Sequence, residues 1–222
     1  MITPLPQTLS AWSDPGSSER ERAIIPLEAE GDAFVAPTEH DSFEQLTRAV
    51  GECRRCALAE ERTQTVFGIG NPAAGILFIG EAPGREEDLR GEPFVGKAGQ
   101  LLDRMLAAIG LDRDSAYIMN MLKCRPPGNR DPQAAEVEAC SEWFDRQWQL
   151  LDPKVVCLLG RIAAQSLLTT DAPLSSLRGR WHTLRGVPTM VTYHPAYLLR
   201  SPDQKGRAWH DLLQLRQRIK VS

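Results

Sequence analysis

Two short stretches of this chain follow the same pattern. The run Ile76-Leu77-Phe78-Ile79 leads directly into Gly80-Glu81-Ala82-Pro83-Gly84, and Thr189-Met190-Val191-Thr192-Tyr193 leads into His194-Pro195-Ala196. Each is an apolar, β-rich run that ends abruptly in a loop with an ionisable residue beside Gly or Pro, which is typical of a buried strand. Ligands of open α/β sheets bind outside the carboxyl ends of parallel strands. The pattern therefore predicts that Glu81 and His194 meet in one pocket.

Further strands and helices alternate along the chain. The expected strands are 76–79, 117–122, 155–159 and 190–193. Apolar residues at spacings of three and four predict helices over 43–50, 98–109, from Pro132 onward, over 161–168 and over 208–219. Alternation of this kind predicts an α/β fold with three α/β/α layers around a central, mainly parallel, four-stranded sheet.

The first 41 residues differ from the rest in composition. They contain five prolines and no sustained apolar period, so we expect a flexible, acidic extension before a domain over residues 42–222. Residues 1–44 hold two basic and nine acidic residues, which leaves 24 basic and 20 acidic residues for the remainder. A mildly basic body can accept a polyanion on one face. No apolar run is long enough for a membrane span and no signal peptide is evident, so a soluble, cytoplasmic protein is expected.

Four of the five cysteines lie in polar or loop-adjacent contexts: Cys53, Cys56, Cys124 and Cys140. Cys157, inside a strand, is interpreted as a buried small hydrophobe. In a cytoplasmic chain four such thiols are expected to bind a metal rather than form disulfides. The four thiols could bind either zinc or an iron–sulfur cluster, and the wide separation of Cys124 and Cys140 in the sequence suits the cluster better.

Four segments are expected to meet at the pocket. They are Gly80–Gly84 with Glu86-Glu87-Asp88, Pro93–Gly96, Asn120–Pro127, and His194–Arg200. In this order, with the cysteines interleaved, they resemble the family 4 uracil-DNA glycosylases, which carry a [4Fe-4S] cluster. The resemblance covers about residue 43 to the C-terminus. It implies a uracil-DNA glycosylase-like fold and a monofunctional DNA repair hydrolase, which releases uracil from single- or double-stranded DNA in base excision repair without strand cleavage. A monomer is expected.

The segments also fit this chemistry individually. An enzyme that removes a base must extrude it from the stack and hold it in a pocket. Phe94 offers a face for stacking, or else serves as a core anchor. The Asn120 amide carries a donor and an acceptor side by side and can pair with uracil O4 and N3–H, whereas cytosine presents the opposite pattern. A strand-end Asn can also simply cap a turn.

The leaving base needs a donor at O2, and His194 is the candidate if its imidazole is neutral and its other nitrogen is held by a partner. Backbone N–H groups around Gly80, Ala82 and Gly84 can add to this cradle. Glu81 either positions the attacking water or orients the loop. The resemblance implies that Glu87 crowds the C5 face of the base and excludes thymine. No lysine in these segments has an obvious neighbour that would lower its pKa, so attack on the sugar by an amine is not expected.

Leu198, Leu199 and Arg200 follow the histidine turn. In a loop, the two leucines can fill the gap left by an extruded base while Arg200 binds a phosphate; alternatively, the leucines begin a packed helix.

Two other functions stay open at this stage. One is a non-catalytic nucleic-acid-binding module with a structural metal or iron–sulfur site, and the other is a cluster-containing hydrolase of free nucleotides.

Overall fold

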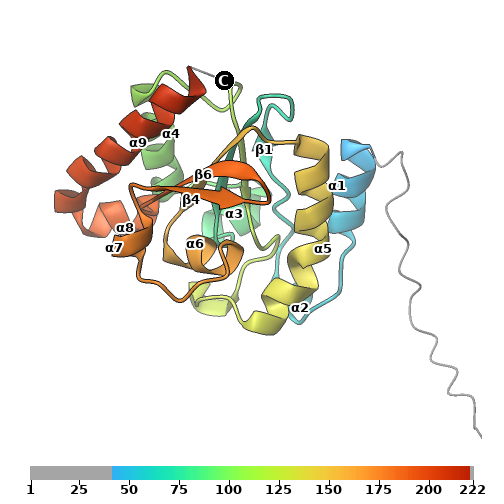
Figure 1. The fold of residues 1–222 in the computed structure, drawn as a ribbon. Helices are drawn as coiled ribbons and strands as arrows, with labels where there is room; N and C mark the ends of the chain where they lie inside the picture. Colours follow the sequence, from blue (N-terminus) through green and yellow to red (C-terminus); the bar gives the residue numbers. More distant parts are fainter. Residues whose placement is uncertain (1–41, 221–222) are drawn as a thin grey trace, which may run out of the picture. The chain divides into compact units, whose positions relative to one another are not determined.

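The computed structural model describes residues 42–220, and the expectation for residues 1–41 lies outside this range. The described residues form one mixed sheet with helices on both faces (Figure 1). Within them, no helix combines the length and the apolar character that crossing a membrane requires.

The four expected strands are the four parallel strands of the sheet. They are β2 (Ile76–Gly80), β3 (Tyr117–Asn120), β4 (Val155–Leu159) and β6 (Val187–Thr192), which pair in the order β3-β2-β4-β6.

The sheet has six strands rather than four, because a short antiparallel strand flanks each side. β1 (Ile69–Gly70) pairs with β3, and β5 (Trp181–Leu184) pairs with β6. β5 joins β6 through Arg185 and Gly186, which both have positive φ (51° and 83°), as a type I′ hairpin turn requires. These edge strands are short or half-exposed, so they lack the continuous apolar run that marks the central strands.

Within residues 42–220, all five expected helices are present, together with four shorter ones. The helices are α1 (Phe43–Gly51), α2 (Leu58–Glu61), α3 (Arg85–Arg90), α4 (Lys97–Ala108), α5 (Ala134–Leu151), α6 (Arg161–Leu167), α7 (Leu174–Leu177), α8 (Pro195–Arg200) and α9 (Lys205–Ile219), with 3₁₀ turns at η1 (Pro127–Asn129) and η2 (Pro202–Gln204). The start of α1 is a capping box, in which the Ser42 hydroxyl accepts from the Gln45 N–H (3.1 Å) and the Gln45 side chain accepts from the Ser42 N–H (2.8 Å).

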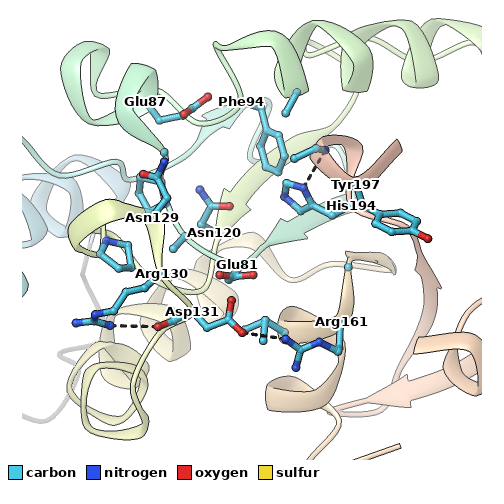
Figure 2. Close-up of a pocket in the computed structure, with 18 of the residues that line it drawn as sticks. Glu81, Glu87, Phe94, Asn120, Asn129, Arg130, Asp131, Arg161, His194 and Tyr197 are labelled. Atoms are coloured by element: carbon cyan, nitrogen blue, oxygen red, sulfur yellow. Dashed lines mark hydrogen bonds and ion pairs between the residues drawn. The ribbon is translucent and has the colours of Figure 1, made fainter. Parts of the chain in front are cut away.

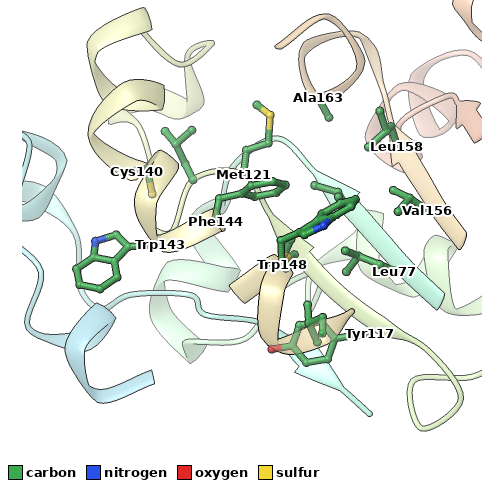
Figure 3. Close-up of a cluster of buried hydrophobic side chains, with 14 of the residues drawn as sticks. Leu77, Tyr117, Met121, Cys140, Trp143, Phe144, Trp148, Val156, Leu158 and Ala163 are labelled. Atoms are coloured by element: carbon green, nitrogen blue, oxygen red, sulfur yellow. The ribbon is translucent and has the colours of Figure 1, made fainter. Parts of the chain in front are cut away.

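Side chains of the strands alternate between two cores. Leu77 belongs to a core with α1, α5 and α6, while the next residue, Phe78, belongs to a core with α4, α8 and α9. In Figure 3, Phe144 and Trp148 of α5 lie over the sheet beside Leu77. Cys157 is fully buried in the second core, which confirms its interpretation as a small hydrophobe. With both faces covered, the loops at the carboxyl ends of the parallel strands are where a site can open.

Candidate functional site

A cavity of about 480 Å³ lies at the carboxyl ends of the parallel strands. Glu81 follows β2, Asn120 ends β3, Arg161 begins the helix after β4, and His194 follows β6; all four line the cavity (Figure 2). The expected convergence of Glu81 and His194 is therefore confirmed.

Most of the other predicted pocket residues also line this cavity: Ala82, Gly84, Glu87, Phe94 and Arg200. Gly80 lies against two of its walls, since a Cβ on Gly80 would be 2.3 Å from Asn120 Oδ1 and 2.7 Å from Phe94 Cζ. Glycine at this position lets the amide and the aromatic ring approach the strand end closely.

Asn120 presents an unsatisfied acceptor. Its side chain is 2% exposed, and among the described residues its Oδ1 has no hydrogen-bond partner. A buried polar atom without a partner costs on the order of 1–3 kcal/mol, so natural proteins keep few of them. The amide lines the cavity, so a ligand there can supply the missing donor.

Phe94 is held in an unusual backbone conformation. Its φ is 55°, which is rare for a bulky residue. The guanidinium of Arg113 donates to the carbonyls of Pro93 (3.1 Å) and Phe94, and a Cβ on Gly99 would overlap the Phe94 carbonyl at 1.6 Å. The Phe94 ring is buried, and its centroid is 5.6 Å from that of His194. Arg113 lies outside every segment that the sequence singled out, because its role depends on a contact across the fold.

His194 is held neutral with one nitrogen occupied. Its Nδ1 accepts from the Ala196 N–H (3.1 Å), so the proton of the neutral ring resides on Nε2. Burial, and secondarily the positive charge of the nearby Arg200, lowers the pKa of His194 to about 4, although the Glu87 charge opposes this shift. At neutral pH the imidazole is therefore an uncharged donor through Nε2–H.

Glu81 shares its wall of the cavity with an ion pair. Asp131 and Arg161 form this pair (2.8 Å) beside Glu81 (Figure 2). Burial, and secondarily the Asp131 charge, raises the pKa of Glu81 to about 7, while Arg161 opposes the rise. Neither Asp131 nor Arg161 was predicted, since each is an ordinary charged residue in a loop or at a helix start.

Glu87 has a structural partner that the sequence did not indicate. Its Oε1 accepts from the N–H groups of Val95 (2.9 Å) and Gly96 (3.0 Å), at the N-terminus of α4. A carboxylate is favoured there by the unpaired N–H groups and the helix dipole. The carboxylate is thus fixed in the cavity wall.

The expected leucine loop is instead helix α8. Leu198 is 1% exposed and packs in the core with α4 and α9, so the prediction that it contacts DNA is wrong. Leu199 is 41% exposed but does not line the cavity, whereas Tyr197 (37% exposed) and Arg200 do. The structure thus replaces the expected leucine wedge with a helix whose first leucine, Leu198, is a core residue.

The four predicted cysteine ligands line a second, smaller cavity. Cys53 and Cys56 come from the loop between α1 and α2, Cys124 from the loop after β3, and Cys140 from α5. Two N–H donors point at sulfur atoms: Trp143 Nε1 lies 3.0 Å from Cys53 Sγ and Arg62 Nη1 lies 3.1 Å from Cys124 Sγ. Such donors stabilise thiolates, so the residues present fit a thiolate-bound group.

Lys123 is buried beside this site rather than in the first cavity. Burial lowers its pKa to about 8, a shift that the sequence did not indicate. Its ammonium donates to the Asn120 carbonyl (2.9 Å), the Phe67 carbonyl (3.3 Å) and Gln147 Oε1 (2.6 Å). Lys123 therefore supports the segment that presents Asn120 and does not face the cavity.

Comparison with known proteins agrees with this geometry. Residues 67–213 match the family model of the uracil DNA glycosylase superfamily. The chain is 45% identical to the type-4 uracil-DNA glycosylase of Archaeoglobus fulgidus over 170 residues (73% of this chain, 85% of the relative). It is 39% identical to that of Sulfurisphaera tokodaii (80% and 84% covered) and 40% identical to that of Saccharolobus solfataricus (73% and 79% covered).

Proposed function

The chain belongs to the type-4 uracil-DNA glycosylases and is a hydrolase that releases uracil from DNA; from this premise we propose which of its side chains perform the reaction. The observation that carries the proposal is the buried, unpaired Oδ1 of Asn120 in a cavity shared with Phe94, His194 and Glu81. The module without catalysis, left open above, is set aside by the family membership.

Recognition rests on Phe94 and Asn120. The extruded base stacks on the Phe94 ring, while Asn120 Oδ1 accepts from uracil N3–H and the same amide donates to O4. Cytosine has an acceptor at N3 and a donor at position 4, so both groups of the amide stay unpaired. The binding free energy is then less favourable by an amount of kcal/mol order. Glu87, fixed by two N–H groups, stands on the C5 side and disfavours the methyl group of thymine.

Hydrolysis rests on His194 and Glu81. As the bond from C1′ to N1 breaks, negative charge develops on the base and the Nε2–H of His194 donates to O2. Ionised Glu81 accepts a hydrogen bond from water, which attacks C1′ and passes its proton to the carboxylate. Uracil leaves as an anion and takes a proton from solvent. The His194 donor meets negative charge on the base that exists only as the bond breaks, which is how binding energy lowers a barrier.

The product is an abasic site in an unbroken strand. Strand cleavage by a glycosylase requires an amine that attacks C1′. Among the described residues that line the cavity there is no lysine, and the Lys123 ammonium is bound to three acceptors elsewhere.

For the four cysteines we propose a [4Fe-4S] cluster rather than zinc. A tetrahedral zinc site brings its sulfurs to about 3.8 Å from one another, given Zn–S bonds of about 2.3 Å. Within residues 42–220, no three metal-binding side chains are arranged to hold a single ion, although all four thiols line one cavity. When bound, such a cluster supplies structural cross-links between the α1–α2 loop, the loop after β3 and α5, and no open coordination position.

The function is tested with a labelled oligonucleotide that contains one uracil. Incubation followed by hot alkali should cleave the strand at the uracil, whereas incubation without alkali should leave it intact. Intact DNA after alkali contradicts the function, and cleavage without alkali contradicts the absence of an amine step. The cofactor is tested separately: the purified protein should absorb broadly near about 400 nm, as thiolate-bound iron–sulfur clusters do, and a colourless zinc-containing protein contradicts the cluster. Cytoplasmic location and a monomeric state stay predictions.

A further inference from the structure

Helix α8 places one aromatic and one basic side chain at the edge of the cavity. Tyr197 and Arg200 are three residues apart, on one side of the helix, and both line the cavity. Leu198 faces the core, and Leu199 lies outside the cavity lining. The surface that α8 offers to a substrate at this edge is therefore an aromatic ring next to a guanidinium.

The Tyr197 ring is held in place from beneath. It stacks on Tyr193, with ring centroids 5.1 Å apart and planes inclined by 23°. Tyr193 is itself buried: its hydroxyl donates to Gln204 Oε1 (3.1 Å), and the guanidinium carbon of Arg178 lies 5.1 Å from its ring centroid. The exposed ring thus belongs to a rigid column, and ordering it for a further stacked ring costs little conformational entropy.

Extrusion of a base creates a need for such a ring. The nucleotides beside the extruded one lose a stacking partner, at a cost of a few kcal/mol. An aromatic side chain can replace that partner regardless of sequence, because every base has a π face. A guanidinium nearby can bind the phosphate of the same nucleotide.

We propose that Tyr197 is a stacking platform for the nucleobase adjacent to the extruded uracil, with Arg200 on its phosphate. The inference rests on the proposed function, because it places the neighbouring nucleotide relative to the uracil cavity. The ligand is a DNA nucleotide of any base, and the platform extends the Tyr193–Tyr197 stack by one ring.

The chain offers a matched control for this role. Trp209 on α9 is exposed to the same degree (38%), but it lines a separate apolar groove with Leu101 and Leu212 instead of the cavity. Replacing Trp209 removes an equally exposed aromatic ring without touching the uracil site.

The test uses oligonucleotides that carry 2-aminopurine on the 5′ or the 3′ side of a non-hydrolysable 2′-fluorodeoxyuridine. Binding of the unaltered protein should change the 2-aminopurine emission on one side, since stacking on tyrosine alters its fluorescence. Tyr197→Ala should abolish this change and weaken binding by roughly 5- to 150-fold, the range for one lost stacked base. Tyr197→Phe and Trp209→Ala should retain both the signal and the affinity.

Uracil release by the unaltered protein is measured alongside. If it releases uracil while Tyr197→Ala binds equally well and gives the same emission change, the platform is wrong and the function stands. If the unaltered protein releases no uracil, the proposed function itself is contradicted, and the platform that rests on it is contradicted as well. Equal loss of affinity in Tyr197→Ala and Tyr197→Phe also overturns the proposal, because stacking needs the ring and not the hydroxyl. Each variant is compared with the unaltered protein by thermal unfolding.

Discussion

Replacement of Gly80 by alanine tests the geometry of the uracil site directly. Gly80 ends β2, and its φ lies outside the left-handed region, so alanine meets no backbone strain there. The new Cβ would nevertheless be 2.3 Å from Asn120 Oδ1 and 2.7 Å from Phe94 Cζ. Ordinary contacts begin at 3.4 Å, so the amide oxygen has to retreat by roughly 1 Å.

The retreat should be costly because Asn120 has little room. The residue is 2% exposed, and its carbonyl is held by the buried ammonium of Lys123. A misplacement of about 1 Å in a catalytic site can reduce the rate on the order of 10²-fold. We therefore expect Gly80→Ala to lower the single-turnover rate of uracil release about 100-fold, measured by alkali cleavage of an oligonucleotide with one uracil.

Gly206→Ala serves as the control for this experiment. Gly206 lies in α9, and a Cβ there has no atom within 4 Å. Its rate should equal that of the unaltered protein, while the free energy of unfolding rises by about 0.5–1 kcal/mol from better helix propensity. A folded Gly80→Ala protein that releases uracil at the normal rate would falsify the placement of the Asn120 amide against the bound base.

Three further outcomes are expected. The kcat/KM should rise with pH through about 7, because burial raises the pKa of Glu81 to about 7 and only the ionised carboxylate accepts from water. Asp131→Asn should move this rise in kcat/KM to lower pH, and Arg161→Gln should move it to higher pH. A rise that neither variant moves contradicts the role of Glu81. Asn120→Ala should abolish uracil release and leave DNA affinity, measured by fluorescence anisotropy, nearly unchanged; parallel loss of both would make Asn120 structural. Residues 1–41 hold eight acidic and two basic residues, whereas the remainder of the chain has a net positive charge. Their deletion should raise DNA affinity at low salt, and equal affinity at 20–50 mM salt (about 14–20 Å screening length) dismisses a shielding role.

The central sheet was predictable because burial on both faces imposes a continuous apolar run. Ile76–Gly80 and Val155–Leu159 have this pattern and form central strands. The edge strand Trp181–Leu184 contacts solvent on one side and owes its place to pairing with β6, a long-range hydrogen-bonding pattern with only a weak local signal.

The site was predictable where topology alone decides position. Glu81 and His194 follow strands of one parallel sheet, so their convergence needs no knowledge of side-chain packing. Arg161 and Arg113 act through contacts with Asp131 and with the Phe94 carbonyl, which join segments distant in sequence. Leu198 was misplaced because a six-residue helix is too short to show a helical period.

In the mechanism that we propose, the charge states of the cavity account for how one site binds a neutral base and yet favours an anionic leaving group. Burial acts on both titratable groups in the same sense, toward the uncharged form: it lowers the pKa of His194 and raises that of Glu81. A neutral uracil therefore enters a cavity in which the imidazole carries no positive charge, so ground-state binding gains little from electrostatics. In this proposal, as the glycosidic bond breaks, the charge on the base meets the N–H donor of His194 at low dielectric, where a hydrogen bond to an anion is strongest. Because that donor is already oriented by Ala196, no reorganisation is needed at this moment, and the stabilisation falls on the transition state.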